Sequence, residues 1–402
     1  MQNNRLSLLI ISEPFPNINN SFLGTFVVNQ VNELTKKYNV VVITLYGPSI
    51  YNLFVKHQKK IIHKENLTIY YIRYYPMWMV GLRVLRLISG KTLCLLNKKY
   101  SSKKVLKLAV KINQKHKFDL VHGHEIYIGD ESSKVGKALN IPSIFTLHGL
   151  YQYHVQCFGK KVVNKAIENL AHFNKLISVS KIAANSYLSN GLNHINFEII
   201  PNGITLKNNL KPTNRISSFT KNKTVLLTVG FFVPEKRISK SIEALYSLKL
   251  SGYRDIVLLI VGTGKLKSKL ERLVKRLNLS DSVLFTGQIL PEQMSSIYSV
   301  ANILVHPSIV DSFSMVCLEA MSYGIPIICT KNIGLVEYIH PGRDSIVIEP
   351  DNQEQLQKAV KKLIDDSNFR IAISQQGKLT AQTLSSYEQT LKVENIYETF
   401  IS

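Results

Sequence analysis

The feature that most constrains the fold of this 402-residue chain is a regular alternation of short apolar runs with longer segments that have the apolar period of a helix. Such runs predict buried strands, and strict alternation with helices predicts parallel sheets covered on both faces. The expected strands are 6–11, 40–45, 120–122, 143–147, 176–180, 224–229, 256–261, 283–285, 303–305, 327–329 and 345–348. The expected helices are 25–37, 103–116, 134–139, 160–173, 239–249, 266–277, 293–300, 318–323 and 353–365.

The alternation pauses once, over residues 206–223, which are polar and lack an apolar period. The length also exceeds that of one ordinary hydrophobic core. We therefore expect a first α/β domain over 1–205, a linker over 206–223 and a second α/β domain over 224–378. A C-terminal helix over 379–402 is expected to pack back toward the first domain. Two doubly wound sheets of this kind would face each other across a cleft, where their ligands bind beyond the carboxyl ends of the strands.

Positive charge is concentrated in the first half of the chain. The formal net charge is +23, and residues 1–205 carry 26 Lys and Arg against 9 Asp and Glu. Residues 66–118 hold twelve basic residues and no acidic one, and the aromatic and basic residues among them suit a bilayer interface. The residues in question are Tyr70, Tyr71, Tyr74, Tyr75, Trp78, Arg83 and Arg86. We expect an anionic membrane surface as partner and no nucleic acid, because no DNA- or RNA-binding module is recognisable. A plain solubility surface remains the alternative.

The cysteines and apolar segments predict a cytoplasmic protein, and the basic segment 66–118 would place it at the inner face of the cell membrane. Cys94, Cys157, Cys317 and Cys329 show no CxxC pairing, so we expect buried thiols in a reducing compartment, with no disulfide or metal site. The apolar run 6–11 is too short for a signal sequence, and the segment 77–88 is too short and too charged to span a bilayer.

Two glycine turns in the second half are typical of phosphate-binding sites. Gly230 ends one expected strand, and Gly262 and Gly264 end the next, each before a helix. Glycine after a strand lets a phosphate approach the backbone, and the helix N-terminus favours negative charge. Lys236 and Arg237 would add positive charge for a diphosphate. Either turn taken singly is equally typical of an ordinary strand-to-helix connection.

The segment 306–321 carries two acids in different settings. Asp311 stands in a loop, and Glu319 lies inside an apolar helical run, where a carboxylate requires a partner. Sugar or ribose hydroxyls would be such partners, although a capping Asp and a salt-bridged Glu are the structural alternative. Backbone amides from Ser312 to Ser314 would favour an anion at the start of that helix. In the first half His148 ends an expected strand before Gly149, a position that is more often structural than catalytic.

Taken together, several segments resemble the retaining glycosyltransferase family 4, which has the GT-B fold. The matching segments are 228–236, 260–264, 283–287, 298–308, 319–326 and 334–337, with looser matches at 24–26, 146–149, 178–180 and 200–203. The resemblance implies two Rossmann-like domains and transfer of a sugar, with retention and without a metal, from a nucleotide-diphosphate sugar, most simply a UDP- or GDP-sugar. The implied acceptor is a saccharide or a lipid-linked saccharide in cell-surface polysaccharide biosynthesis.

The resemblance also implies a role for each matching residue. Lys236 would bind the donor diphosphate, Asp311 the transferred sugar and Glu319 the ribose. The amides of Ser314, Met315 and Val316 would help to hold the donor pyrophosphate, and Ile289 would meet its base. Gly24 and Thr25 would line the acceptor side, with His148 near the acceptor and the reacting carbon. The donor-binding residues expected from the glycine turns are Gly230, Arg237, Gly262 and Gly264, and the expected catalytic residues are Lys236, Asp311 and His148. Catalysis would rest on stabilisation of the departing diphosphate by Lys236 and helix N-termini.

The chain departs from the family pattern at a few of these positions. Phe231 stands where many members have an Arg, and Arg237 is the candidate to compensate. Asp311 replaces a Glu, and Ser312 and Ser314 stand where Gly is common. Three other functions therefore stay open: a nucleotide-sugar epimerase, a glycan phosphorylase, and a non-catalytic sugar-nucleotide-binding partner subunit.

Overall fold

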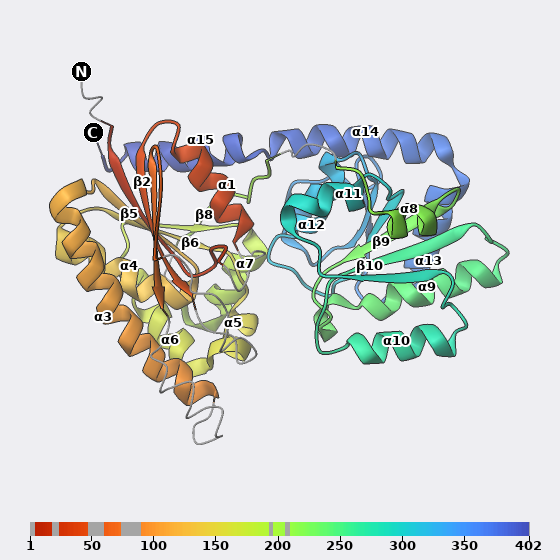
Figure 1. Ribbon diagram of the computed structural model, residues 1–402, viewed down its shortest axis with the longest axis horizontal. Coiled ribbons are helices and arrows are strands. Elements are labelled where there is room, and N and C mark those ends of the chain that lie inside the picture. The colour runs from red at the N-terminus through yellow and green to blue at the C-terminus, as the bar shows by residue number, and fades with distance from the viewer. Residues whose placement is uncertain are drawn as a thin grey trace. The chain divides into compact units, whose positions relative to one another are not determined.

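The computed structural model describes residues 5–17, 24–46, 60–73, 90–192, 196–205 and 210–401, and the chain in it divides into two compact units (Figure 1). The first unit comprises Met1–Gly203 and Ser386–Ser402, and the second comprises Ile204–Ser385. The C-terminal residues thus return to the first unit after the chain has completed the second.

The first unit is built on an eight-stranded sheet among its described residues, in the order β3-β4-β2-β1-β5-β6-β7-β8. All neighbouring strands are parallel except β3 and β4, which are antiparallel. The strands are β1 (Ser7–Ser12), β2 (Asn39–Tyr46), β3 (Ile61–Lys64), β4 (Leu67–Arg73), β5 (Leu120–His124), β6 (Ser143–Leu147), β7 (Lys175–Ser178) and β8 (Glu198–Ile199). The helices are α1 (Thr25–Leu34), α3 (Gly90–His116), α4 (Ile126–Leu139), α5 (Tyr151–Phe158), α6 (Lys160–Glu168), η1 (Leu170–His172), α7 (Lys181–Tyr187), η2 (Leu188–Leu192) and α15 (Ser386–Glu398).

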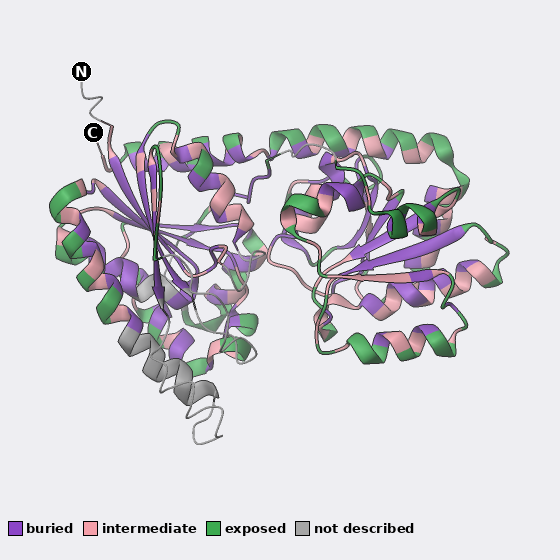
Figure 2. Cartoon of the chain, viewed as in Figure 1, coloured by how far each residue is buried: buried purple, intermediate pink, exposed green. Residues whose placement is uncertain are grey.

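Alternate residues of the central strands enter two separate hydrophobic cores. Leu8 and Ile10 of β1 pack in the core that includes Val27 of α1 and Val393 of α15. Leu9 and Ile11 of the same strand pack instead in the core that contains residues of α3 and α4. Figure 2 shows the central strands, such as β1 and β5, buried along their length. Both faces of the sheet are therefore covered, as the continuous apolar runs predict.

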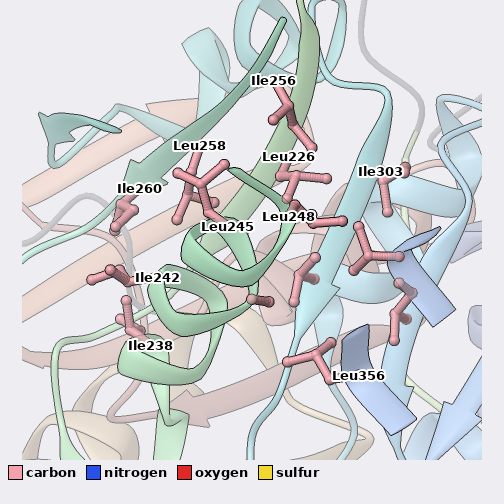
Figure 3. Packing of buried hydrophobic residues seen from close by; sticks show 14 of the residues in the cluster. Leu226, Ile238, Ile242, Leu245, Leu248, Ile256, Leu258, Ile260, Ile303 and Leu356 are labelled. Carbon is pink, nitrogen blue, oxygen red and sulfur yellow. The ribbon is translucent and has the colours of Figure 1, made fainter. Parts of the chain in front are cut away.

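The second unit contains a six-stranded, all-parallel sheet in the order β11-β10-β9-β12-β13-β14. Its strands are β9 (Thr224–Val229), β10 (Ile256–Val261), β11 (Val283–Gly287), β12 (Ile303–His306), β13 (Ile327–Thr330) and β14 (Ile346–Ile348). Its helices are α8 (Asn214–Thr220), η3 (Pro234–Lys236), α9 (Ile238–Leu250), α10 (Lys267–Arg276), η4 (Pro291–Gln293), α11 (Met294–Tyr298), α12 (Met315–Ser322), η5 (Gly334–Glu337), α13 (Gln353–Asp365) and α14 (Ser367–Thr383). Figure 3 shows Leu245 of α9 beside Leu258 of β10 and Ile242 of α9 beside Ile260 of β10.

The ends of the second unit differ from the sequence expectation. The polar segment expected to be a linker contains helix α8, whose Ile216 is buried, so it belongs to the second unit. The expected single C-terminal helix is two helices, of which α14 stays with the second unit and α15 joins the first. On the first unit, Lys37 pairs with Glu398 of α15 at 2.8 Å.

The expected membrane-facing aromatics have different outcomes. Tyr71 lies buried in β4 and donates a hydrogen bond from its hydroxyl to the Pro16 carbonyl at 3.1 Å, and Tyr70 of the same strand packs against the core. The interfacial interpretation is therefore wrong for Tyr71, whose side chain is buried, whereas Tyr70 is half-buried and the interpretation stays a prediction for it. Tyr74, Tyr75, Trp78, Arg83 and Arg86 lie outside the described residues.

Two other expectations concern the thiols and the membrane. Cys317 and Cys329 are buried thiols, whereas Cys157 is exposed, because α5 turns that residue outward. The side chain of Cys94 lies outside the described residues. In the part of the chain that the structure describes, no helix is both long enough and apolar enough to cross a bilayer.

Candidate functional site

The carboxyl edge of the second sheet is formed by three glycine turns. Gly230, Gly262 and Gly287 follow or end the neighbouring strands β9, β10 and β11. The Gly230 amide donates to the Val261 carbonyl at 3.0 Å, and the Gly262 amide donates to the Gly287 carbonyl at 2.9 Å. Gly262 has φ 132°, and a Cβ there would lie 2.0 Å from the Gly230 oxygen. No other residue type fits, so bare backbone is held at this edge.

Lys236 lies at this edge and contacts Asp311. The turn η3 that carries Lys236 is tied to the loop after β12, because the Glu235 carbonyl accepts hydrogen bonds from Ile309 N at 2.9 Å and Ser308 Oγ at 3.2 Å. The Lys236 ammonium then reaches Asp311 Oδ2 at 2.5 Å. The two side chains are 23% and 19% exposed, so the ion pair remains accessible to a ligand. The structure thus brings together the two residues expected to hold the diphosphate and the transferred sugar.

A buried histidine, His306, supports Asp311 from the other side. Its Nε2 lies 3.4 Å from Asp311 Oδ2 and 3.2 Å from the Ser314 hydroxyl. Burial alone would raise the pKa of Asp311, but the Lys236 charge and His306 hold that pKa well below its usual range. Asp311 therefore stays ionised. Sequence reasoning missed His306, although its position at the end of a strand resembles that of His148.

Ser314 precedes α12 in a strained conformation. Its φ of 81° and ψ of 74° lie in the left-handed region, which residues other than glycine rarely adopt. Strain of this kind persists where neighbouring structure fixes it, and it is concentrated at functional sites. Met315 and Val316 then form the first turn of α12, where amide groups lack carbonyl partners within the helix and favour an anion.

Glu319 lies one turn further along α12 and is paired by a hydroxyl. Tyr298, from α11, donates a hydrogen bond to Glu319 Oε2 at 2.7 Å. Ile289 is half-buried in the loop that follows β11 and Gly287. Both residues belong to the second unit, as does Gly264, which follows β10.

Arg237, the expected substitute for the missing family arginine, is engaged elsewhere. Its Nε and Nη2 donate to the two carboxylate oxygens of Asp351 at 2.7 Å and 3.0 Å. Such bidentate pairs fix the guanidinium plane. Phe231 is 52% exposed, and Lys236 lies five residues after it. The Asp351 pair does not favour a phosphate role for Arg237.

In the first unit, Gly24 and Thr25 lie at the start of α1, whose Phe26 contacts His148. Gly24 has φ 69° and immediately precedes the helix, and the Phe26 ring lies 4.3 Å from the His148 ring, centroid to centroid. His148 Nδ1 lies 3.1 Å from Asn202 Oδ1, and its Nε2 lies 3.0 Å from His124 Nδ1. Both ring nitrogens of His148 therefore have protein partners.

Polar side chains line the carboxyl ends of the central strands on this face of the first sheet. His122 lies 2.6 Å from the Tyr397 hydroxyl of α15 and 2.7 Å from Thr146 Oγ1. Burial lowers the pKa of His122 to about 3 and that of His148 to about 4. The imidazoles are therefore neutral at physiological pH. Among the described residues, no three His, Cys, Asp or Glu side chains are grouped so as to hold a metal ion.

Comparisons with known proteins agree with this architecture. The model of the family described as Glycosyltransferase Family 4 matches residues 23–208, and that of Glycosyl transferases group 1 matches residues 211–380. An uncharacterized glycosyltransferase of Methanocaldococcus jannaschii is 27% identical over 306 residues, which cover 73% of this chain and 78% of that protein. The lipopolysaccharide glucosyltransferase WaaG of Escherichia coli is 29% identical over 210 residues, 50% of this chain and 55% of that protein.

Solved structures match the fold over nearly the whole chain. Sucrose-phosphate synthase from Thermosynechococcus elongatus gives a TM-score of 0.74 at 19% identity, covering 98% of this chain and 99% of that one. HepE of Anabaena in complex with UDP-glucose gives a TM-score of 0.72 at 16% identity, covering 98% and 100%. With two family models that together span most of its length, the chain has the GT-B fold and belongs to the glycosyltransferases of family 4.

Proposed function

We propose that this glycosyltransferase moves a sugar from a nucleotide-diphosphate sugar, most simply a UDP- or GDP-sugar, to a hydroxyl of a saccharide or lipid-linked saccharide. The transfer retains the anomeric configuration and serves the synthesis of a cell-surface polysaccharide. Family membership supports the reaction class, and HepE of Anabaena, whose solved complex contains UDP-glucose, supports the type of donor.

The observation that carries this proposal is the Lys236–Asp311 pair beside the glycine turns. An ammonium group, bare backbone and the first turn of α12 favour a pyrophosphate, because all three present positive charge or N–H groups to it. In this proposal the Lys236 ammonium leaves Asp311 and pairs with the diphosphate, while the Asp311 carboxylate accepts a hydrogen bond from a hydroxyl of the transferred sugar. Glu319, held by Tyr298, binds the ribose hydroxyls, and the backbone at Ile289 meets the base.

Catalysis in this proposal is mainly electrostatic. The bond from the sugar to the diphosphate breaks, and negative charge grows on the departing phosphate, where Lys236 and the α12 amides stabilise it. Because an ammonium group meets that charge directly, we propose that no metal ion takes part. The acceptor oxygen then bonds to the sugar carbon and gives up its proton to an oxygen of the departing diphosphate.

Activity and binding assays with matched variants test this function. A thermal-shift panel of nucleotide sugars should identify the donor, because a bound ligand stabilises the native state. With that donor, Lys236→Ala should lower kcat/KM by about a hundred- to a thousandfold. The control is Lys358→Ala, whose side chain is 74% exposed on α13 and pairs with Glu354 of the same helix. An unchanged rate in Lys236→Ala would contradict the proposal.

One observation favours a second candidate, a non-catalytic partner subunit that binds the nucleotide sugar. Phe231 replaces the family arginine, and Arg237 is held by Asp351, so Lys236 faces the diphosphate without them. Tight binding of a nucleotide sugar without hydrolysis or transfer would identify this function. Conversion of the donor sugar without any acceptor would instead identify an epimerase.

The basic helix α3 supports a peripheral site of action at the inner face of the cell membrane. Lys103, Lys107 and Lys111 are exposed at a spacing of four residues, which places them along one side of the helix. Such a stripe attracts anionic lipid headgroups. Flotation with phosphatidylserine vesicles should be lost when the three lysines are replaced by Gln, and retained when Lys267, Lys269 and Lys275 of α10 are replaced. Equal flotation of both variants would rule out α3 as the attachment surface.

A further inference from the structure

The residue after β5 adopts a backbone conformation that its type strongly disfavours. Glu125 has φ 77° and ψ 143°, in the region that essentially only glycine enters at low energy. Its amide donates to the Thr146 carbonyl at 3.1 Å, and its own Oε1 accepts from Ile126 N at 3.1 Å, where α4 begins. Strain of this kind persists at a residue when the surrounding structure fixes it, and it marks candidate functional positions.

A chain of buried side chains orients the Glu125 carboxylate. His154 Nε2 of α5 lies 3.0 Å from Glu125 Oε1, and the other ring nitrogen of His154 is bonded to the Tyr187 hydroxyl. His154 is 2% exposed and Tyr187 is fully buried. At position 149 a Cβ would lie 2.4 Å from the His154 ring, so only glycine allows the loop after β6 to lie this close to His154. The Oε1 atom is therefore fixed on both sides.

The second carboxylate oxygen, Oε2, has no hydrogen-bond partner among the described residues, and the Glu125 side chain is 11% exposed. It lies beside the His148–Gly149 loop, 3.4 Å from the position that a Cβ of residue 149 would take. Both nitrogens of His148 are already bonded within the protein. Of these two side chains, Glu125 is therefore the one with a polar atom available to a ligand.

The neighbouring side chains indicate what kind of ligand fits. Tyr153 of α5 is 60% exposed, and its ring lies 5.8 Å, centroid to centroid, from that of His154, the residue that contacts Glu125 Oε1. Glu13 follows β1 where Ser12 pairs with His124, so the two carboxylates follow neighbouring strands. An open aromatic ring beside acceptor oxygens suits a saccharide, which presents C–H faces and hydroxyl donors.

The geometry points to Glu125 as the residue that binds a hydroxyl of the saccharide acceptor through Oε2, with Tyr153 packing on the sugar ring and with His154 and Tyr187 as positioning residues. This inference rests on the proposed function. The His154 contact lowers the pKa of Glu125 despite its burial. A carboxylate with a lowered pKa is a weak base, so its role is to bind and orient the hydroxyl.

The test uses the full-length protein, the donor from the thermal-shift panel, and two probes, octyl β-D-glucoside and octyl α-D-mannoside. Glu125→Gln replaces one of the two carboxylate oxygens, Oε1 or Oε2, with an NH2 group. We expect this change to raise the KM for the accepted glycoside at least tenfold. Hydrolysis of the nucleotide sugar by water should stay within twofold of wild type. Tyr153→Ala, at an exposed site that leaves folding intact, should raise the same KM severalfold. His154→Gln should raise it less than Glu125→Gln, with an unchanged KM for the donor.

The matched control is Glu168→Gln, an exposed residue at the end of α6 in the same unit. An unchanged glycoside KM in both Glu125→Gln and Tyr153→Ala would overturn the inference while leaving the proposed function intact. The inference would also be overturned if the wild-type protein hydrolysed the nucleotide sugar but did not glycosylate either glycoside and showed no binding of either one by ligand-observed NMR. If the wild-type protein binds and turns over no nucleotide sugar, the proposed function fails, and the acceptor role fails with it.

Discussion

The two units place opposite chemistry at the carboxyl edges of two similar parallel sheets. In the second unit the edge carries an ammonium group, Lys236, paired with Asp311 beside bare glycine backbone. In the first unit the edge carries neutral imidazoles and one oriented carboxylate, Glu125. The edge of the second unit therefore suits a polyanion, and the edge of the first unit suits neutral hydroxyls. The same architecture is thus specialised by a few side chains after its strands, as is general for this kind of sheet.

Replacing Gly262 tests how far the second edge depends on bare backbone. Gly262→Ala places a Cβ 2.0 Å from the Gly230 oxygen at positive φ, and we expect a loss of about 3 kcal/mol in the free energy of unfolding. Gly252→Ala is the control, since Gly252 also has positive φ but nothing within 4 Å of its added Cβ. Urea unfolding should show a loss of about 1 kcal/mol for the control. Equal losses would mean that the close approach is unimportant.

The two edges should respond differently to acid. In the first unit the pKa values of His122 and His148 are about 3 and about 4, below their unfolded value near 6.5, so only the unfolded state takes up protons as the pH falls. Each histidine should therefore lower the free energy of unfolding by about 2 kcal/mol between pH 7 and pH 5.

In the second unit the lowered pKa of Asp311 affects stability at lower pH, because the stabilisation by the ionised Asp311 is lost only below its unfolded pKa near 4. Thermal unfolding from pH 7.5 to pH 4.5 measures the effect of the histidines, and its extension to pH 3 measures that of Asp311. Stability that is constant from pH 7 to pH 5 would contradict the neutral assignment of the histidines. A His122→Asn variant should show a shallower decline than the wild-type protein.

Ser314 offers a smaller test, in which strain and a hydrogen bond oppose each other. Ser314→Gly relieves the left-handed backbone but loses the hydroxyl contact to His306, so its free energy of unfolding should stay within about 1 kcal/mol of wild type. Ser314→Ala keeps the strain and loses the contact, and it should be about 1 kcal/mol less stable than wild type. If Ser314→Ala proved as stable as wild type, the contact to His306 would be irrelevant to the site.

The smallest expected effect concerns Arg237. Because its guanidinium is held by Asp351 in an exposed pair, Arg237→Ala should change donor KM by less than twofold and stability by less than about 1 kcal/mol. Steady-state kinetics with the identified donor measures the change. A tenfold or larger rise in KM would show that Arg237 leaves Asp351 and grips the phosphate, as the sequence led us to expect.

The sequence predicts the residues at the carboxyl edge of the second unit's sheet better than those at the edge of the first unit's sheet, for a physical reason. Gly230, Lys236, Gly262 and Asp311 each lie in a short segment directly after a strand, so the alternation alone assigns them to one edge. The bond of His122 to Tyr397 joins residues 275 positions apart, and no local pattern records it.

Other differences arise where local signals are ambiguous. Strand β4 is rich in tyrosine and borders a basic segment, so its composition indicates an interface, whereas its pairing with β2 decides its structure. Glu125 is invisible in sequence because its signal is a backbone angle. The break between α14 and α15 is equally subtle, since Leu384 and Ser385 resemble the helical residues around them.

The central claim is that the second unit alone holds the pyrophosphate through Lys236, and calorimetric titration with UDP and with GDP tests it most directly. We expect one of the two nucleotides to bind the wild-type protein, Lys236→Ala to weaken this binding at least tenfold, and Glu125→Gln to leave it within twofold. Equal affinity in Lys236→Ala and wild type, or a loss of nucleotide binding in Glu125→Gln, would contradict this claim.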